Sequence, residues 1–335
     1  MHIEEKIAFL RQPGNYPDKP KRIEVVETHM SWVFLTENFA YKLKKPVRYD
    51  FLDFSTLEAR QKDCEWEVSL NRRLAGQVYL GTVPLTIQED GGLQLDGEGR
   101  VVDWLVQMRR LPADRMLDTA IRERTVDAED VQNISQVLAD FYRFSHPLFI
   151  SPAEYRRRFE EDIQSNLIEL RDSRYALPKA QLDHLEAAQK RFLAEEGGLL
   201  EQRARDGRII DAHGDLRPQH ICLTAPPVII DCLEFNLEFR ILDPMDELAY
   251  LSMECERLGA SHIGDEILGH YREAVGDTCP IELIGFYKAF RACLRAKIAV
   301  WHIADHQVQD HQRWLCLAQT YLDLAEGYVW HGNGS

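Results

Sequence analysis

The chain has 335 residues, of which 45% are hydrophobic and 10% aromatic, enough for a substantial core in one or two domains. Its formal net charge of −15 opposes general binding to nucleic acid or to anionic membranes, so we expect neither as a partner. Seven cysteines without a CxxC pair, an acidic N-terminus and no long apolar run predict a reduced, cytoplasmic protein that is neither exported nor membrane-inserted.

The first third of the sequence predicts a small antiparallel β lobe. Alternating apolar residues indicate five strands, at residues 23–27, 32–36, 39–44, 78–87 and 101–108. A charged segment between the third and fourth strands predicts one helix, at residues 57–74. We therefore expect an N-lobe over residues 1–108 and a short hinge at residues 109–112.

The remainder of the sequence predicts a mainly helical lobe over residues 113–335. Helical periodicity covers residues 114–147, 153–171, 179–204, 244–258, 262–275 and 281–328. One β island, at residues 208–232, interrupts the helices. A small β lobe followed by a large helical lobe with a β-hairpin makes the chain an α+β protein, in the order typical of the protein-kinase-like bilobal fold.

The segment 211–236 carries the strongest chemical signal. It contains His213-Gly214-Asp215, then two short apolar strands around a two-proline turn, then Asp231. Phosphoryl transfer needs one carboxylate that takes a proton from the attacking hydroxyl and a second that holds a metal on the phosphates. Asp215 and Asp231 fit these two roles. The alternative is that Asp215 caps a turn and Asp231 ends a strand.

Seven segments carry a resemblance to a known family: residues 31–36, 41–47, 51–58, 70–74, 213–215, 231–236 and 286–297. With them the chain resembles the aminoglycoside phosphotransferase family, and in particular uncharacterised bacterial phosphotransferase domains that are often fused to a P-loop ATPase domain. The resemblance implies an ATP-dependent or GTP-dependent kinase that uses Mg²⁺, with Mn²⁺ as an alternative, to phosphorylate a hydroxyl of a small molecule. Because no GxxxxGK[ST] loop occurs, we expect no P-loop domain in this chain.

Two lysines on the third strand are candidates for binding the nucleotide phosphates. Lys42 lies two residues after Ala40, a small residue that would lie under the adenine, and Lys44 points the same way and stays an alternative. The following helix should supply a carboxylate to hold the lysine. We choose Glu67 over Glu65, because Glu67 shares a helical face with other residues that turn toward the core.

Two further segments are expected near the nucleotide. The glycine-free turn from Thr28 to Ser31 occupies the place of a phosphate-covering loop, so the Ser31 hydroxyl is a candidate donor, with a simple polar turn as the alternative. By resemblance, the backbone of Gln107, Met108 and Arg109 contacts adenine; Met108 could instead belong to the core.

The resemblance also assigns roles within segment 211–236. Asp215 is the proton acceptor, His213 braces the loop, and Arg217 adds positive charge beside the transferred phosphate. Asp231 coordinates the metal. His220 stands where the family has a metal-binding asparagine, and imidazole favours Mn²⁺ or Zn²⁺ over Mg²⁺.

Three hypotheses about function therefore stay open. The leading one is the small-molecule kinase. His220 and the glycine-free turn favour a nucleotide-binding pseudokinase with a regulatory role. A metallohydrolase that binds metal through His213, Asp215, His220 and Asp231 is the third.

Glu234 would assist a second metal or orient the acceptor, or else face solvent in a loop.

Overall fold

The computed structural model describes residues 2–49, 52–304 and 310–329. Residue 51 of the segment 51–58 and residues 305–309 of the predicted helix 281–328 lie outside this description. Proximity of Cα atoms divides the chain into two units. The first unit comprises residues up to Met116 together with His220–Phe239, and the second comprises Leu117–Gln219 and the residues from Arg240 onward.

The first unit is built on a six-stranded sheet in the order β1-β2-β3-β8-β6-β7, with every neighbouring pair antiparallel. These strands are Glu24–Glu27 (β1), Ser31–Leu35 (β2), Phe39–Lys44 (β3), Tyr79–Ile87 (β6), Leu93–Leu95 (β7) and Arg100–Arg109 (β8). Two short strands, Arg48–Tyr49 (β4) and Leu52–Asp53 (β5), pair with each other. All five predicted strands are present, and β4, β5 and β7 are additional.

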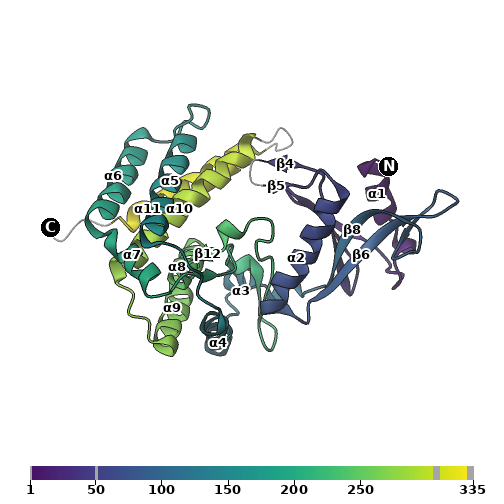
Figure 1. The fold of residues 1–335 in the computed structure, drawn as a ribbon, viewed down its shortest axis with the longest axis horizontal. Helices are drawn as coiled ribbons and strands as arrows, with labels where there is room; N and C mark the ends of the chain where they lie inside the picture. The colour runs from purple at the N-terminus through teal and green to yellow at the C-terminus, as the bar shows by residue number, and fades with distance from the viewer. Residues whose placement is uncertain (1, 50–51, 305–309, 330–335) are drawn as a thin grey trace. The chain divides into compact units, whose positions relative to one another are not determined.

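One long helix, α2 (Leu57–Ala75), packs against β6 and β8 of this sheet (Figure 1). Thr56 caps its N-terminus by accepting a hydrogen bond from the Ala59 N–H. The alternation along β3 gives the sheet two different faces. Tyr41 and Leu43 pack in one apolar cluster, whereas Ala40 lies in a second cluster that contains residues of α2.

An N-terminal helix that the sequence analysis did not predict, α1 (Ile3–Leu10), is joined to the sheet through a buried charge cluster. The Lys6 Nζ lies 2.7 Å from an Asp103 carboxylate oxygen. The Arg60 Nε donates to the other Asp103 oxygen at 2.8 Å. All three side chains are at least nine-tenths buried. Asp103 therefore connects α1, α2 and β8 through one carboxylate.

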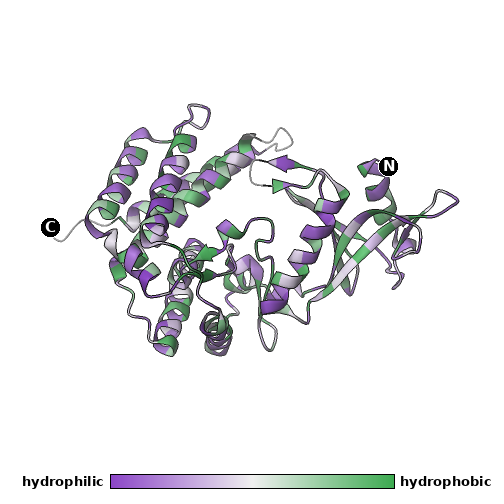
Figure 2. Ribbon diagram, in the orientation of Figure 1, coloured by the Kyte–Doolittle hydropathy of each residue, from purple (hydrophilic) through white to green (hydrophobic). Residues whose placement is uncertain are grey.

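The second unit is mainly helical, and hydrophilic and hydrophobic residues alternate along most of its helices (Figure 2). Its helices are Leu117–Glu123 (α3), Ala128–Phe144 (α4), Pro152–Leu170 (α5), Lys179–Glu196 (α6), Gly198–Arg205 (α7), Pro244–Arg257 (α8), Ser261–Val275 (α9), Ile281–Ala304 (α10) and His311–Gly327 (α11). The predicted helix 114–147 is two helices, because Arg124 has a positive φ of 58° and Asp127 caps α4. The predicted helix 179–204 is likewise two helices, α6 and α7, which are separated at Gly197.

The chain around Asp215 and Asp231 contributes strands to two small ladders. In the first unit, Ile221–Cys222 (β10) pairs with Val228–Ile229 (β11), as the predicted hairpin requires. In the second unit, Ile210–Asp211 (β9) pairs with Ile241–Leu242 (β12). Strand β11 also contacts α2, and so residues 220–239 group with the sheet rather than with the helices. The boundaries 1–108, 109–112 and 113–335 stay a prediction.

The predicted α+β class is confirmed, because an antiparallel sheet unit with one long helix is followed by a helical unit. Short 3₁₀ helices of three residues each occur at Pro13–Asn15, Ala113–Arg115, Pro218–His220 and Leu237–Phe239. Within residues 2–49, 52–304 and 310–329, no helix is both long and apolar enough to cross a membrane.

Replacing Asp103 by alanine should strongly destabilise the first unit. The substitution leaves the ammonium of Lys6 and the guanidinium of Arg60 buried without their shared carboxylate, which costs about 3–5 kcal/mol of unfolding free energy. Urea denaturation measures this loss. Glu89→Ala, at an exposed position of the same unit, is the control and should change the value by less than about 0.5 kcal/mol. A loss as small as the control's would show that the buried cluster contributes little.

Candidate active site

Lys42 connects the helix α2 to the residue that follows the hairpin. Its Nζ lies 2.9 Å from Glu67 Oε1 and 3.1 Å from Asp231 Oδ1. Burial lowers the pKa of Lys42, but Asp231, Glu67 and Glu234 outweigh that effect and raise it well above the ordinary 10.5. The ammonium therefore stays charged. Glu65, the rejected alternative to Glu67, is exposed on the other side of α2.

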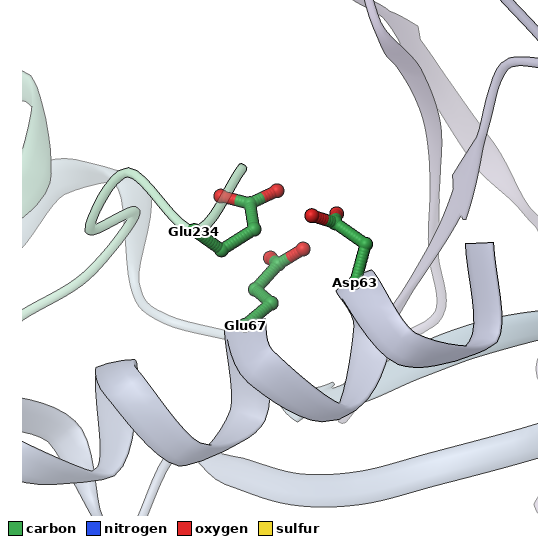
Figure 3. Close-up of side chains that lie close together, drawn as sticks. All are labelled: Asp63, Glu67 and Glu234. Atoms are coloured by element: carbon green, nitrogen blue, oxygen red, sulfur yellow. The ribbon is translucent and has the colours of Figure 1, made fainter. Parts of the chain in front are cut away.

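Lys44 has a different environment from Lys42. Its side chain is 1% exposed, and its Nζ lies 2.5 Å from Asp63 Oδ2 and 2.6 Å from Glu67 Oε2. It also donates to Glu234 Oε1. Asp63 and Glu67 extend from α2 toward Glu234, which comes from the loop after β11 (Figure 3). The structure thus brings both candidate lysines to Glu67. It also buries Glu234, for which the sequence analysis had kept an exposed loop position as an alternative.

The main chain around Asp231 is fixed by three successive N–H groups. Ile230 N–H donates to the His220 carbonyl at 2.9 Å, and Asp231 N–H donates to the Tyr79 hydroxyl at 3.2 Å. Cys232 N–H donates to the Asn71 side chain at 2.9 Å. Asp231 has a φ of 62°, in the left-handed region. This arrangement holds a half-exposed carboxylate beside Lys42.

His220 lies beside Asp231 in the first unit. Its Nε2 is 3.5 Å from Asp231 Oδ2, and its side chain is 9% exposed. The donor set is therefore one carboxylate with exposed oxygen and one imidazole. The carboxylate fits Mg²⁺, which prefers oxygen ligands and keeps several waters, whereas the imidazole suits Mn²⁺ better.

The turn between β1 and β2 is closed by hydrogen bonds of its own. Thr28 N–H donates to the Ser31 carbonyl at 2.8 Å, and Ser31 N–H donates to the Thr28 hydroxyl oxygen at 3.0 Å. Ser31 is 2% exposed and pairs with Lys44 in the ladder between β2 and β3. The structure therefore gives the turn a local hydrogen-bonded form, and the role of Ser31 as a phosphate donor stays a prediction.

The predicted adenine contacts lie at the end of β8, which extends to Arg109. Gln107 Nε2 donates to the Tyr41 hydroxyl at 3.0 Å, and Met108 pairs with Ala40 in an apolar cluster. The Arg109 N–H donates to the Val78 carbonyl at 2.9 Å. That N–H group is already used within the sheet, and backbone contact between residues 107–109 and adenine stays a prediction.

Partly buried apolar side chains border the same cluster. Val33 and Leu35 of β2, Leu111, Met116 and Ile230 pack against it and are only partly buried. Ala40 belongs to the buried part of the cluster, and Ile230 directly precedes Asp231. Apolar side chains therefore lie close in sequence and pairing to Lys42 and Asp231.

In the second unit, the loop that carries Asp215 is held by Glu247 of α8. The buried Glu247 carboxylate accepts hydrogen bonds from the His213 N–H and, at 2.6 Å, from the Gly214 N–H. The Tyr142 hydroxyl also donates to Glu247, at 2.8 Å. The His213 ring, 1% exposed, accepts the Asp215 N–H through Nδ1 at 3.3 Å. These contacts give His213 a bracing position in the loop.

Both carboxylate oxygens of Asp215 accept hydrogen bonds inside this unit. The Tyr250 hydroxyl donates to Oδ1 at 2.9 Å, and Arg217 donates to Oδ2 at 2.7 Å. Burial lowers the pKa of Arg217, but Asp215 and Tyr250 outweigh it and raise the value. Asp215 is therefore oriented by one neutral and one charged donor.

Sequence reasoning missed Asp63, Glu247 and Tyr250, and it left Glu234 undecided. Helical spacing could have found some of them. Asp63 precedes Glu67 by four residues and shares its face, and Tyr250 follows Glu247 by three. Among the described residues, Asp63, Glu67 and Glu234 have ligand atoms close enough together to hold a metal ion. This group contains neither His213 nor His220, the histidines of the metallohydrolase hypothesis.

Comparison with known proteins finds likeness across most of the chain. No family model matches it. Proteins of Mycobacterium tuberculosis and Mycobacterium bovis, both described as uncharacterised, are 35% identical over 313 residues, which are 90% of this chain and 60% of each relative. The chain thus spans about 60% of the length of these relatives.

Solved structures show the same architecture. The GDP complex of aminoglycoside 2′-phosphotransferase-IIIa has a TM-score of 0.60 at 14% identity, with 97% of this chain and 99% of that one covered. A choline/ethanolamine kinase family protein from Mesorhizobium loti has a TM-score of 0.55 at 16% identity, with 97% and 95% covered. AMP-bound spectinomycin phosphotransferase APH(9)-Ia has a TM-score of 0.55 at 13% identity, with 97% and 98% covered. The chain therefore has the kinase-like fold of the aminoglycoside phosphotransferases and choline/ethanolamine kinases, as the sequence predicted.

Proposed function

We propose that the chain is an ATP- or GTP-dependent kinase that phosphorylates a hydroxyl of a small molecule. One observation carries the proposal: the Lys42 ammonium bridges the buried Glu67 and the half-exposed Asp231. A lysine held by a helix glutamate beside a metal-binding aspartate is the arrangement that protein kinases need for the phosphates of a nucleotide.

The first unit would bind the nucleotide. Lys42 keeps its charge and is 15% exposed, so it can contact phosphate oxygens while Glu67 fixes its position. The partly buried side chains of Val33, Leu111 and Ile230 would line the base. Asp231, with His220 beside it, would hold the divalent cation. That cation neutralises phosphate charge when it is bound.

The second unit would supply the group that activates the acceptor. Asp215 would accept the proton of the acceptor hydroxyl, since Tyr250 and Arg217 orient its carboxylate. The contacts of Glu247 with the main chain at residues 213 and 214 would keep the loop in place. Positioning and charge neutralisation would supply most of the rate enhancement, as in other phosphoryl transfers.

The pseudokinase hypothesis is supported by a specific observation, the imidazole of His220 beside Asp231 where an amide oxygen is expected. An imidazole weakens the case for Mg²⁺ and favours Mn²⁺. The two hypotheses differ in turnover, because a pseudokinase binds the nucleotide without transferring its phosphate.

Nucleotide binding should depend on Lys42 and Asp231. We expect ATP or GTP with Mg²⁺ or Mn²⁺ to raise the Tm of the native chain, because a ligand that binds only the folded state stabilises it. Lys42→Met and Asp231→Asn should weaken binding at least about tenfold by calorimetry, since each removes a charged contact. Lys45→Met is the matched control, because the Lys45 amine pairs with Glu27 on β1 instead. Undiminished binding in both site variants would contradict the proposal.

Asp215→Asn should separate binding from transfer. The variant should bind nucleotide as the native chain does, but its transfer rate should fall about 10²–10⁴-fold, because the amide cannot take the proton. Transfer of labelled phosphate from ATP to a panel of small hydroxyl compounds, with an aminoglycoside and choline among them, measures this. Nucleotide binding by the native chain without transfer or hydrolysis with any metal would favour the pseudokinase.

The contribution of Lys42 to stability should not change between pH 7 and about 9.5. Its folded-state pKa lies well above the unfolded value of 10.5, so the contribution is complete below that value and is lost only as the pH rises through the folded-state pKa. Urea denaturation of the native chain and of Lys42→Met at several pH values gives the difference. A difference that shrinks steadily across this range would mean that the amine loses its proton there.

A further inference from the structure

Lys44 is surrounded by carboxylates in the manner of a bound cation. Oxygens of Asp63, Glu67 and Glu234 lie within 4.8 Å of one another, a spacing at which a metal ion could bind. The Lys44 Nζ contacts all three carboxylates. The ammonium donates hydrogen bonds to Glu67 and Glu234, and Asp63 lies at ion-pair distance. Figure 3 shows the three carboxylates converging from α2 and from the loop after β11.

Burial distinguishes Lys44 from Lys42, although the two lie on one face of β3. The side chain of Lys44 is 1% exposed, and its partners are also buried. Lys42 is 15% exposed, and its partner Asp231 is 48% exposed. Only Lys42 therefore combines a charged amine with access to a ligand. Burial lowers the pKa of Lys44, but Glu234, Glu67 and Asp63 outweigh it, so that the amine remains a cation.

The contacts of Lys44 reach both groups that the proposed site uses. Glu67 gives Oε2 to Lys44 and Oε1 to Lys42, so Lys44 fixes the orientation of the carboxylate that holds Lys42. Glu234 follows Asp231 by three residues, so its bond to Lys44 ties the Asp231 loop to β3 and α2. Without the ammonium, three buried carboxylates would repel one another.

We propose that Lys44 is a built-in cation and a positioning residue, which takes the place at Asp63, Glu67 and Glu234 that a divalent ion would otherwise occupy. Glu234 would then be committed to Lys44, and Asp231 with His220 would be left to hold the divalent cation. This inference rests on the proposed function for its ligand, but the cation role of Lys44 can be tested without any nucleotide.

Two substitutions separate the positive charge from the space that the side chain fills. Lys44→Met removes the charge and keeps the volume, and Lys44→Ala leaves room for an ion among the carboxylates. Both should lower the Tm by roughly 5–10 °C in the presence of EDTA. Millimolar Mn²⁺ should then raise the Tm of Lys44→Ala by roughly 3 °C more than that of Lys44→Met or the native chain. Lys6→Met, which removes a buried ammonium from a single carboxylate, is the control and should gain no more from Mn²⁺ than the native chain.

The second measurement is nucleotide affinity. If Lys44 only stabilised the fold, its replacement would not change the affinity of the folded variant. Lys44→Met should bind ATP with Mg²⁺ at least about tenfold more weakly than the native chain at a temperature where both are folded. Glu234→Gln keeps a neutral acceptor, and so it should fold even if the lysine variants do not. It should weaken the same binding at least about threefold, whereas Glu238→Gln, exposed in the same loop, should not.

The outcomes separate this inference from the proposed function. If Mn²⁺ stabilises Lys44→Ala no more than Lys44→Met, or if the native chain binds nucleotide and Glu234→Gln binds it equally well, the role of Lys44 is wrong. If the native chain binds no nucleotide, the proposed function fails. Rescue of Lys44→Ala by Mn²⁺ would still establish the cation role in that case.

Discussion

One glutamate shared by two lysines organises the first unit. Lys42 and Lys44 lie two residues apart on β3, so both amines reach the same face of the sheet, where Glu67 of α2 offers one oxygen to each. A buried charge without a partner is costly, so each of these side chains depends on the others. The orientation of Lys42 follows from this requirement, and the same pairing adds to the apolar and main-chain contacts that hold α2 and the Asp231 loop on the sheet.

The two candidate catalytic aspartates are held in different ways. Asp231 is positioned through its main chain, by N–H groups that donate to the hairpin, to Tyr79 and to Asn71. Asp215 is positioned through its side chain, by Tyr250 and Arg217, on a loop that Glu247 supports. The first arrangement leaves a carboxylate half exposed, as the proposed cation site requires. The second orients both oxygens of a carboxylate, as the proposed proton acceptor requires.

Local patterns predicted much of this molecule. The alternation in residues 39–44 placed the lysines on one face, and helical spacing selected Glu67 instead of the exposed Glu65. The two prolines at 226 and 227 indicated the hairpin. These features are encoded by neighbours in the sequence, for which period and turn chemistry are sufficient signals.

Contacts between distant segments could not be predicted in this way. Glu234 lies 190 residues from Lys44 in sequence, and nothing near Glu234 distinguishes a buried partner from an exposed loop residue. The helix α1 is only eight residues long, and its bond from Lys6 to Asp103 joins positions 97 residues apart. The short strand β7 likewise forms by pairing with β6. The sequence pattern of so short a segment does not specify its partner.

The first unit is discontinuous in sequence, since residues 220–239 complete a unit that otherwise ends at Met116. During synthesis the sheet and α2 leave the ribosome long before Asp231 and Glu234 exist. Until then, Lys42 has only Glu67, and Lys44 has only the two acids of α2. Residues 220–239, encoded much later, add two further carboxylates to the two lysines and two acids that the early part of the chain already holds. A fragment that stops at Met116 would keep the pairs within β3 and α2 but would lack these two contacts.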